Sequence, residues 1–247
     1  MPVHESASRG FERQADAYER GRPAYPQQAT EWLTTALGLG PGRTVVDVGA
    51  GTGKLTRALL SSGAQVVAVE PVTAMRGVLS RELPTVRVLD GTAESLPLTD
   101  GAAEAIVVGQ AFHWFDQPAA LAEFHRVLVP GGRLGLVWNV RDRMQELQRA
   151  IDEITEPLRG DAPSHAGGEW RVAVGSSALF TPVEQSSVPF ALELDSDTFV
   201  DRIGSISFIA ALDDPRRAQV LERVRHLASE HPEPWSYVTE LLVYERS

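Results

Sequence analysis

A short apolar run that ends in three alternate glycines limits the fold of this chain more than any other feature. The run is Val45-Val46-Asp47-Val48-Gly49-Ala50-Gly51-Thr52-Gly53. Glycine allows a positive φ and lets a ligand approach the backbone where a Cβ atom would collide. The spacing is GxGxG, and Lys54 stands where the dinucleotide fingerprint GxGxxG has its third glycine. We therefore expect a buried strand and a ligand-binding glycine loop, and the spacing counts against a nicotinamide dinucleotide.

Short β-branched runs alternate with helical stretches beyond residue 43, which is typical of parallel strands joined by right-handed crossovers. We expect an α/β fold: a Rossmann-like, doubly wound sheet of seven strands, mostly parallel, with an antiparallel C-terminal pair and a helical cover. The expected strands are 44–48, 65–69, 86–89, 105–108, 133–138, 183–190 and 237–244. The expected helices are 54–61, 74–82, 118–128, 141–158, 196–212 and 216–230.

The length of 247 residues suits one α/β domain with an insertion rather than two full domains. We expect a single domain over residues 1–247. Residues 1–30 would form an N-terminal lid segment. Regular alternation stops after residue 139, so residues 141–230 would form a partly inserted substrate cover.

The composition argues against several classes of function. The formal net charge is -10, so a polyanion such as DNA or tRNA is an unfavourable partner. The basic pairs Arg216-Arg217 and Arg223/Arg225 read as a solvated helix face. No stretch is apolar enough to cross a membrane, and the polar N-terminus does not resemble a secretory signal. The sequence has no cysteine. We therefore expect a cytoplasmic protein without nucleic-acid or membrane partners and without a thiolate metal site.

An acidic residue ends the second expected strand, in Val69-Glu70-Pro71. The carboxyl ends of parallel strands share one edge of the sheet, which places Glu70 beside the glycine loop. An ionised carboxylate there can accept both hydroxyls of an adenosine ribose. The alternative is a solvated loop acid.

These residues resemble the class I S-adenosylmethionine methyltransferases, in particular the small-molecule branch with the ubiquinone-biosynthesis and trans-aconitate enzymes. The resemblance runs over residues 11–139, with a weaker echo at 237–246. It implies S-adenosylmethionine as cofactor, with Glu70 at the ribose, Pro71 in contact with the cofactor and Met75 along the adenine, unless Met75 is simply a core residue. The loop holding the methionine part of the cofactor would be Asp47, Gly49, Ala50, Gly51 and Gly53.

The loop after the third expected strand reads Gly91-Thr92-Ala93-Glu94-Ser95-Leu96-Pro97. It is similar to the Gly-Asp-Ala-Glu-x-Leu-Pro pattern of the family, whose aspartate accepts a hydrogen bond from the adenine amino group. Thr92 replaces that aspartate here. The resemblance implies that Thr92, Ala93 and Glu94 lie at the adenine edge, with a weaker acceptor than usual.

Two further segments match the small-molecule branch. The N-terminal stretch resembles a lid helix whose aromatic and arginine side chains close over the cofactor, which implies substrate-side positions for Tyr18 and Tyr25. Core packing is the alternative for both tyrosines. The segment Gln110-Ala111-Phe112-His113-Trp114-Phe115 follows the fourth strand and resembles the Ala-His-Trp-Phe segment of the trans-aconitate group. It implies Gln110 near the cofactor and His113 and Trp114 near the transferred methyl group.

Methyl transfer is an in-line displacement at an activated carbon, so the protein mainly supplies orientation and no metal is needed. His113 is the candidate catalytic residue, as a base for a hydroxyl acceptor, as an orienting group for a carboxylate, or as a brace for its loop. The arginines in the cover are Arg141, Arg143, Arg171 and Arg202. One or two of them could hold an anionic substrate by a bidentate contact, and the alternative for each is a surface charge.

We expect methylation of a small-molecule acceptor, on a carboxylate or hydroxyl oxygen. The alternatives are a nicotinamide-dependent oxidoreductase and a protein that binds S-adenosylmethionine without transferring its methyl group.

Overall fold

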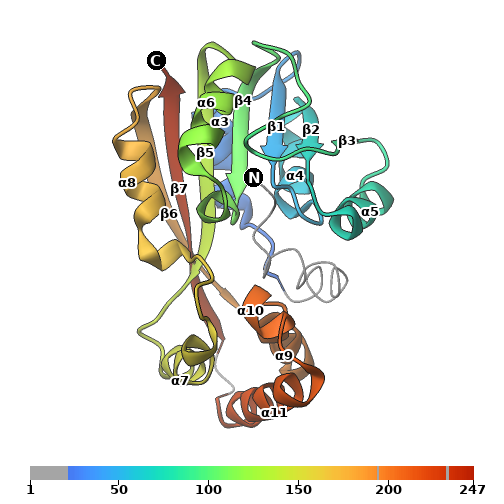
Figure 1. The fold of residues 1–247 in the computed structure, drawn as a ribbon, viewed down its shortest axis with the longest axis vertical. Helices are drawn as coiled ribbons and strands as arrows, with labels where there is room; N and C mark the ends of the chain where they lie inside the picture. The colour runs from blue at the N-terminus through green and yellow to red at the C-terminus, as the bar shows by residue number, and fades with distance from the viewer. Residues whose placement is uncertain (1–21, 194, 232–233) are drawn as a thin grey trace.

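The computed structural model describes residues 22–193, 195–231 and 234–247. Its centre is a seven-stranded sheet in the order β3-β2-β1-β4-β5-β7-β6 (Figure 1). β7 runs antiparallel to both of its neighbours, and the other strands are parallel to one another. The expected sheet with its C-terminal antiparallel pair is confirmed. The strands are β1 Thr44–Val48, β2 Gln65–Val69, β3 Arg87–Leu89, β4 Ala103–Gly109, β5 Leu128–Arg141, β6 Phe180–Leu192 and β7 Trp235–Arg246.

Helices cover both faces of the sheet because its central strands are apolar on both sides. Val45 of β1 faces the core formed with α3 (Gln27–Ala36) and α4 (Lys54–Leu59). Val46 faces the opposite core, formed with α6 (Gln117–Val127) and α8 (Glu169–Gly175). The helix α5 (Thr73–Glu82) packs its buried Leu79 against β2. The sheet therefore has two separate hydrophobic layers.

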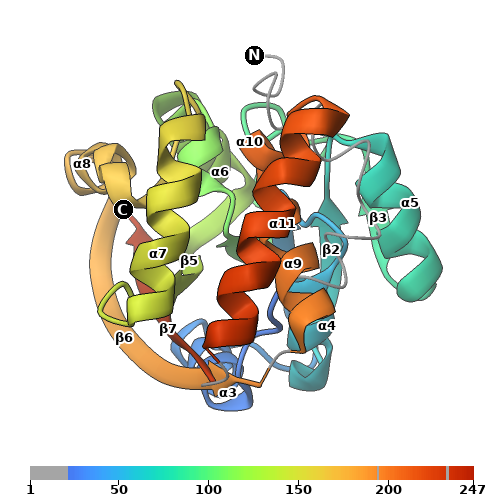
Figure 2. The same ribbon diagram turned by 90° about the horizontal axis from the view of Figure 1, so that it is seen from below.

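A second group of helices lies beyond the carboxyl ends of the parallel strands (Figures 1 and 2). These helices are α7 Glu146–Thr155, α9 Ser196–Gly204, α10 Ser207–Ala210 and α11 Asp214–Glu230. They share a core that includes Ile151, Ile203 and Val224, and Tyr237 of β7 belongs to the same core. β7 therefore ties this group, which we call the cover helices, to the sheet.

Several boundaries differ from the sequence-based expectation. β5 continues to Arg141 because it pairs with β7 as far as Arg141, which lies opposite Tyr237. The helix expected from residue 141 begins only at Glu146. The expected helix 196–212 is interrupted at residues 205–206 between α9 and α10. Helices α3 and α8 were not expected. None of the helices in the described ranges is long and apolar enough to cross a bilayer.

Candidate functional site

The order of the strands reverses between β1 and β4, so the segments that follow these two strands meet at one edge. Gly49, Gly51 and Gly53 after β1 all have positive φ, at 68°, 59° and 91°. A Cβ atom on Gly49 would lie 2.9 Å from the Cβ of Ala111, in the segment after β4. Glycine at this position therefore lets the loop after β1 pack against the loop after β4.

A small cavity of about 40 Å³, here called the smaller cavity, lies at this edge. It brings together seven of the sequence-predicted residues: Tyr25, Asp47, Gly49, Ala50, Gly51, Gln110 and Arg202. Its lining also includes Thr52 and Lys54, which sequence reasoning did not select although both belong to the glycine segment. Gly53 caps α4 instead, and a Cβ there would lie 2.9 Å from Leu79.

Two buried carboxylates support the glycine loop. One oxygen of Asp47 accepts a hydrogen bond from the Thr56 hydroxyl at 2.5 Å, and its Oδ1 has no partner in the described part of the chain. Burial, followed by the nearby Glu70, raises the pKa of Asp47 to about 7. Glu70 accepts the backbone N–H groups of Gly51 at 2.8 Å and Val72 at 2.9 Å, and burial raises its pKa as well. Glu70 therefore holds the conformation of the glycine loop.

The residues expected around the adenine lie near this edge, but none of them lines either cavity described here. Met75 is buried with Val72 and Val78, and the carbonyl of Pro71 accepts a hydrogen bond from Arg76. Thr92 forms an isolated bridge with Ser95, Ala93 is in the core, and Glu94 accepts the backbone N–H of Asp116. Their part in a ligand site stays a prediction.

A larger cavity of about 370 Å³ separates the carboxyl edge of the sheet from the cover helices. We call it the larger cavity. Arg22, Gln110 and Arg202 line both cavities, so the two are adjacent. Gln110 has a φ of 62°, which is uncommon for a residue with a side chain and typical of positions that the surrounding structure holds for a function.

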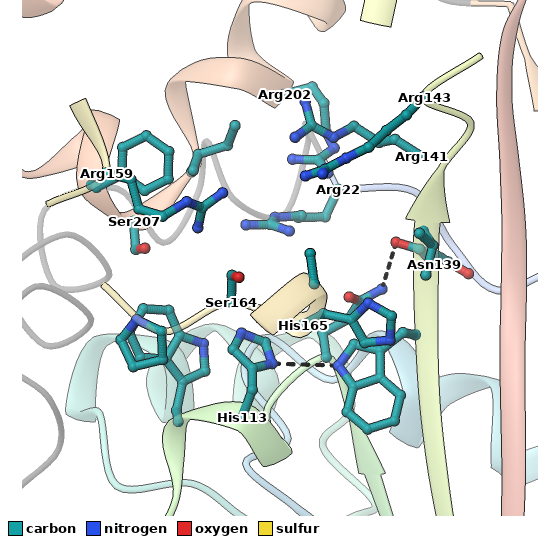
Figure 3. Close-up of a pocket in the computed structure, with 18 residues that line it drawn as sticks. Arg22, His113, Asn139, Arg141, Arg143, Arg159, Ser164, His165, Arg202 and Ser207 are labelled. Carbon is teal, nitrogen blue, oxygen red and sulfur yellow. Dashed lines mark hydrogen bonds between the residues drawn. The ribbon is translucent and has the colours of Figure 1, made fainter. Parts of the chain in front are cut away.

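His113 and Trp114 lie on a short 3-10 turn after β4 and line the larger cavity. The indole N–H of Trp138 donates to Nδ1 of His113 at 3.4 Å (Figure 3). Indole nitrogen only donates, so Nδ1 is the unprotonated nitrogen and Nε2 carries the hydrogen of the neutral ring. Burial, followed by His165, Arg22 and Arg159, lowers the pKa of His113 to about 3. The ring is therefore neutral at physiological pH.

The arginines expected in the cover divide between two places. Arg141, Arg143 and Arg202 line the larger cavity. Arg171 lies on α8, where it pairs with Glu240 at 2.6 Å and stacks on Trp170, and it does not line the cavity. Sequence reasoning missed Arg159.

Other lining residues carried no sequence signal, and one expected residue falls elsewhere. Asn139, Ser164, His165 and Ser207 line the larger cavity, but they come from segments without a recognisable motif. Tyr18 lies outside the described residues.

Comparison with known proteins gives the family. The methyltransferase domain family matches residues 46–136. An uncharacterized methyltransferase of Mycobacterium tuberculosis is 42% identical over 216 residues, which cover 87% of this chain and 84% of that protein.

Solved structures share the fold at lower identity. A putative type II methyltransferase from Anaeromyxobacter dehalogenans has a TM-score of 0.63 and 22% identity, covering 91% of this chain and 97% of its own. The [4+2]-cyclase SpnF has a TM-score of 0.57 and 18% identity, covering 92% and 84%. The same fold thus occurs in proteins named for different reactions, so the fold alone does not give the activity. The relative at 42% identity shows the family. The chain belongs to the class I S-adenosylmethionine-dependent methyltransferases.

Proposed function

We propose that this enzyme binds S-adenosylmethionine in the smaller cavity and transfers its methyl group to a carboxylate oxygen of a small acceptor in the larger cavity. The neutral His113, held as a hydrogen-bond donor in a cavity lined with arginines, is the observation that carries this proposal. Family membership favours methyl transfer over the nicotinamide-dependent alternative.

The residues of the smaller cavity fit the methionine part of the cofactor. The unpartnered Oδ1 of Asp47 is a buried acceptor, which suits an ammonium group. Gly49 and Gly51 both line this cavity, and Gly51 has no side chain that would keep a ligand away from its backbone. Glu70 would accept the ribose hydroxyls with its remaining lone pairs, and Met75 and residues 92–94 would lie toward the adenine. The bound cofactor supplies the activated methyl group, and the protein holds the acceptor in line with it.

His113 acts in this proposal as an orienting donor rather than as a base. Its Nδ1 is occupied by the Trp138 N–H, and its Nε2–H is available to an acceptor oxygen. A group with a pKa of about 3 is a poor base for a hydroxyl. An acceptor that is already ionised needs no base, which favours a carboxylate.

The charges around the larger cavity support the same choice. Its lining includes Arg22, Arg141, Arg143, Arg159 and Arg202, and no acidic side chain from the described residues lines it. Guanidinium groups match the planar geometry of a carboxylate and stabilise its charge.

A hydroxyl acceptor is the second candidate because one pair of residues supplies a possible base. His165 lines the larger cavity, and its Nε2 lies 3.1 Å from Oε2 of Glu240. A histidine held by a carboxylate is a common arrangement for proton removal. His165→Asn would then lower turnover by about 10² to 10⁴.

Two measurements test the proposal. Isothermal titration with S-adenosylhomocysteine tests the cofactor site, and absence of binding contradicts it. The pH dependence of the initial rate then separates the acceptors. At saturating S-adenosylmethionine, methylation of a carboxylate predicts a flat profile between pH 6 and 8.5 in both wild type and His165→Asn. A rate that rises with pH in wild type and is lost in His165→Asn favours the hydroxyl.

A further inference from the structure

The arginines of the larger cavity are concentrated on the side opposite His113 (Figure 3). They come from separate parts of the chain: Arg141 ends β5, Arg159 follows the turn after α7, and Arg202 is on α9. The whole chain has a formal net charge of -10, so this local excess of positive charge is opposite in sign to the average surface. This cluster of arginines therefore reflects a local site and not the overall composition of the chain.

We call Arg141, Arg143, Arg159 and Arg202 the arginine wall. The acidic side chains that pair with it do not neutralise its positive charge. Asp152 pairs with Arg141 at 3.1 Å and with Arg143 at 3.3 Å. Glu156 pairs with Arg143 at 3.5 Å and with Arg159 at 2.7 Å. Three guanidinium groups therefore share two carboxylates, and Arg202 takes part in no ion pair within the described ranges.

Arg202 is the most informative member of the wall because it is only 5% exposed. Its Nε and Nη1 atoms are buried and have no hydrogen-bond partner in the described part of the chain. The Nη1 atom of Arg141 is also buried and also has no hydrogen-bond partner among the described residues. Burial and the nearby charge of Arg202 both lower the pKa of Arg141. Buried charged donors are almost always paired, so two adjacent guanidinium groups with open donors indicate a ligand with negative oxygens.

We propose that Arg141 and Arg202 form a subsite for a second oxyanion of the acceptor, so that the acceptor is a small molecule with two acidic groups. This inference rests on the proposed function in one respect: the reacting carboxylate is assigned to His113, across the cavity from the two arginines. A carboxylate and a phosphate monoester share the chemistry that the open donors require. Either group can form a bidentate contact with a guanidinium group.

Binding measurements test the subsite without turnover. The protein saturated with S-adenosylhomocysteine would be titrated with succinate, glutarate and adipate, and with the monoacids butyrate, pentanoate and hexanoate. We expect the best diacid to bind roughly 10- to 100-fold more tightly than its matched monoacid. Phosphoglycolate, titrated in the same way, tells whether a phosphate replaces the second carboxylate. If every diacid binds no better than its monoacid and phosphoglycolate does not bind, the proposal is wrong.

Arg141→Gln and Arg202→Gln should each remove most of the preference for two acidic groups. Arg171→Gln is the matched control, because Arg171 lies outside the cavity and is paired with Glu240. Arg202→Lys keeps the charge but loses the two-pronged contact, and it should give an intermediate preference. If Arg202→Gln does not fold, Arg141→Gln alone decides, and a preference unchanged in that variant overturns the proposal.

Arg202 also lines the smaller cavity, so the cofactor must be measured separately. Arg141 lines only the larger cavity, so Arg141→Gln should bind S-adenosylhomocysteine with unchanged affinity. If Arg202→Gln loses affinity for S-adenosylhomocysteine but retains the diacid preference, Arg202 belongs to the cofactor site and the proposal is wrong. A diacid that binds through Arg141 and Arg202 but is never methylated would leave the subsite standing and contradict the proposed function.

Discussion

The neutral state of His113 predicts a pH-dependent contribution to stability that a single substitution removes. The ring is half-buried beside Trp138, and its desolvation, followed by its cationic neighbours, lowers its pKa from the ordinary 6.5 to about 3. In the unfolded chain the ring regains its ordinary pKa, so the unfolded state binds a proton more readily. The contribution of His113 to the free energy of unfolding therefore falls as the pH drops below 6.5.

The size of the effect follows from these two values. Between pH 7.5 and pH 5, protonation of the unfolded ring lowers the unfolding free energy by about 2 kcal/mol. The result hardly changes for any folded pKa below about 4, because the folded ring is then neutral at pH 5 in every case. The prediction therefore depends on the ring staying neutral and not on how far its pKa is lowered.

Asp47 acts in the opposite direction. Its pKa rises from 3.8 to about 7 in the folded protein, so folding takes up a proton, and its contribution to stability grows as the pH falls from above 7 toward 4. The wild-type profile contains both effects. The difference between wild type and His113→Asn removes the contribution of Asp47, since that residue is present in both proteins.

The assay is urea unfolding of wild type and His113→Asn at pH 7.5, 6.5 and 5. The amide oxygen of asparagine can still accept the Trp138 N–H. The stability advantage of wild type should shrink by about 2 kcal/mol between pH 7.5 and 5. His226→Asn, at an exposed position on α11, is the control and should show a much smaller change. A constant difference for His113→Asn would mean that the folded ring takes up a proton as readily as the unfolded ring, and it would refute the lowered pKa of His113.

Three further substitutions test the cofactor side. Gly51→Val should lower affinity for S-adenosylhomocysteine at least 100-fold in a protein that still unfolds cooperatively, because Gly51 lines the smaller cavity and its φ of 59° disfavours a β-branched residue; normal affinity would mean that this loop does not bind the cofactor. Glu70→Gln should weaken the same binding by about 1 to 3 kcal/mol, and an unchanged titration would mean that the ribose lies elsewhere. Gln110→Gly should keep the unfolding free energy within about 1 kcal/mol yet reduce turnover, and full activity would deny Gln110 a role.

The central strands could be predicted from local sequence because burial on both faces makes them nearly continuous apolar runs. Strands β1 and β2 have the bounds expected for them. The end of β5 depends on pairing with β7, about a hundred residues later in the chain, and no local pattern reports that. The helix α8 has only two buried residues, Trp170 and Val174, which is too little for a periodic signal.

The candidate site likewise has one part that local sequence signals predict and another that only the fold brings together. The glycine segment and Glu70 are local signals on adjacent strands, and they are brought together by the order of the sheet. The tautomer of His113 depends on Trp138 of the neighbouring strand. The arginine wall is assembled from β5, the segment after α7, and α9, so only the fold of the cover helices brings Arg141 and Arg202 together.

Transfer of a labelled methyl group tests the central claim most directly. The protein would be incubated with S-adenosylmethionine carrying a deuterated methyl group and with a panel of small acids, and the products would be identified by mass spectrometry before and after mild alkali. We predict a labelled methyl ester that alkali hydrolyses back to the starting acid. A labelled product that survives alkali, with the methyl group on nitrogen, carbon or a hydroxyl oxygen, would contradict the account.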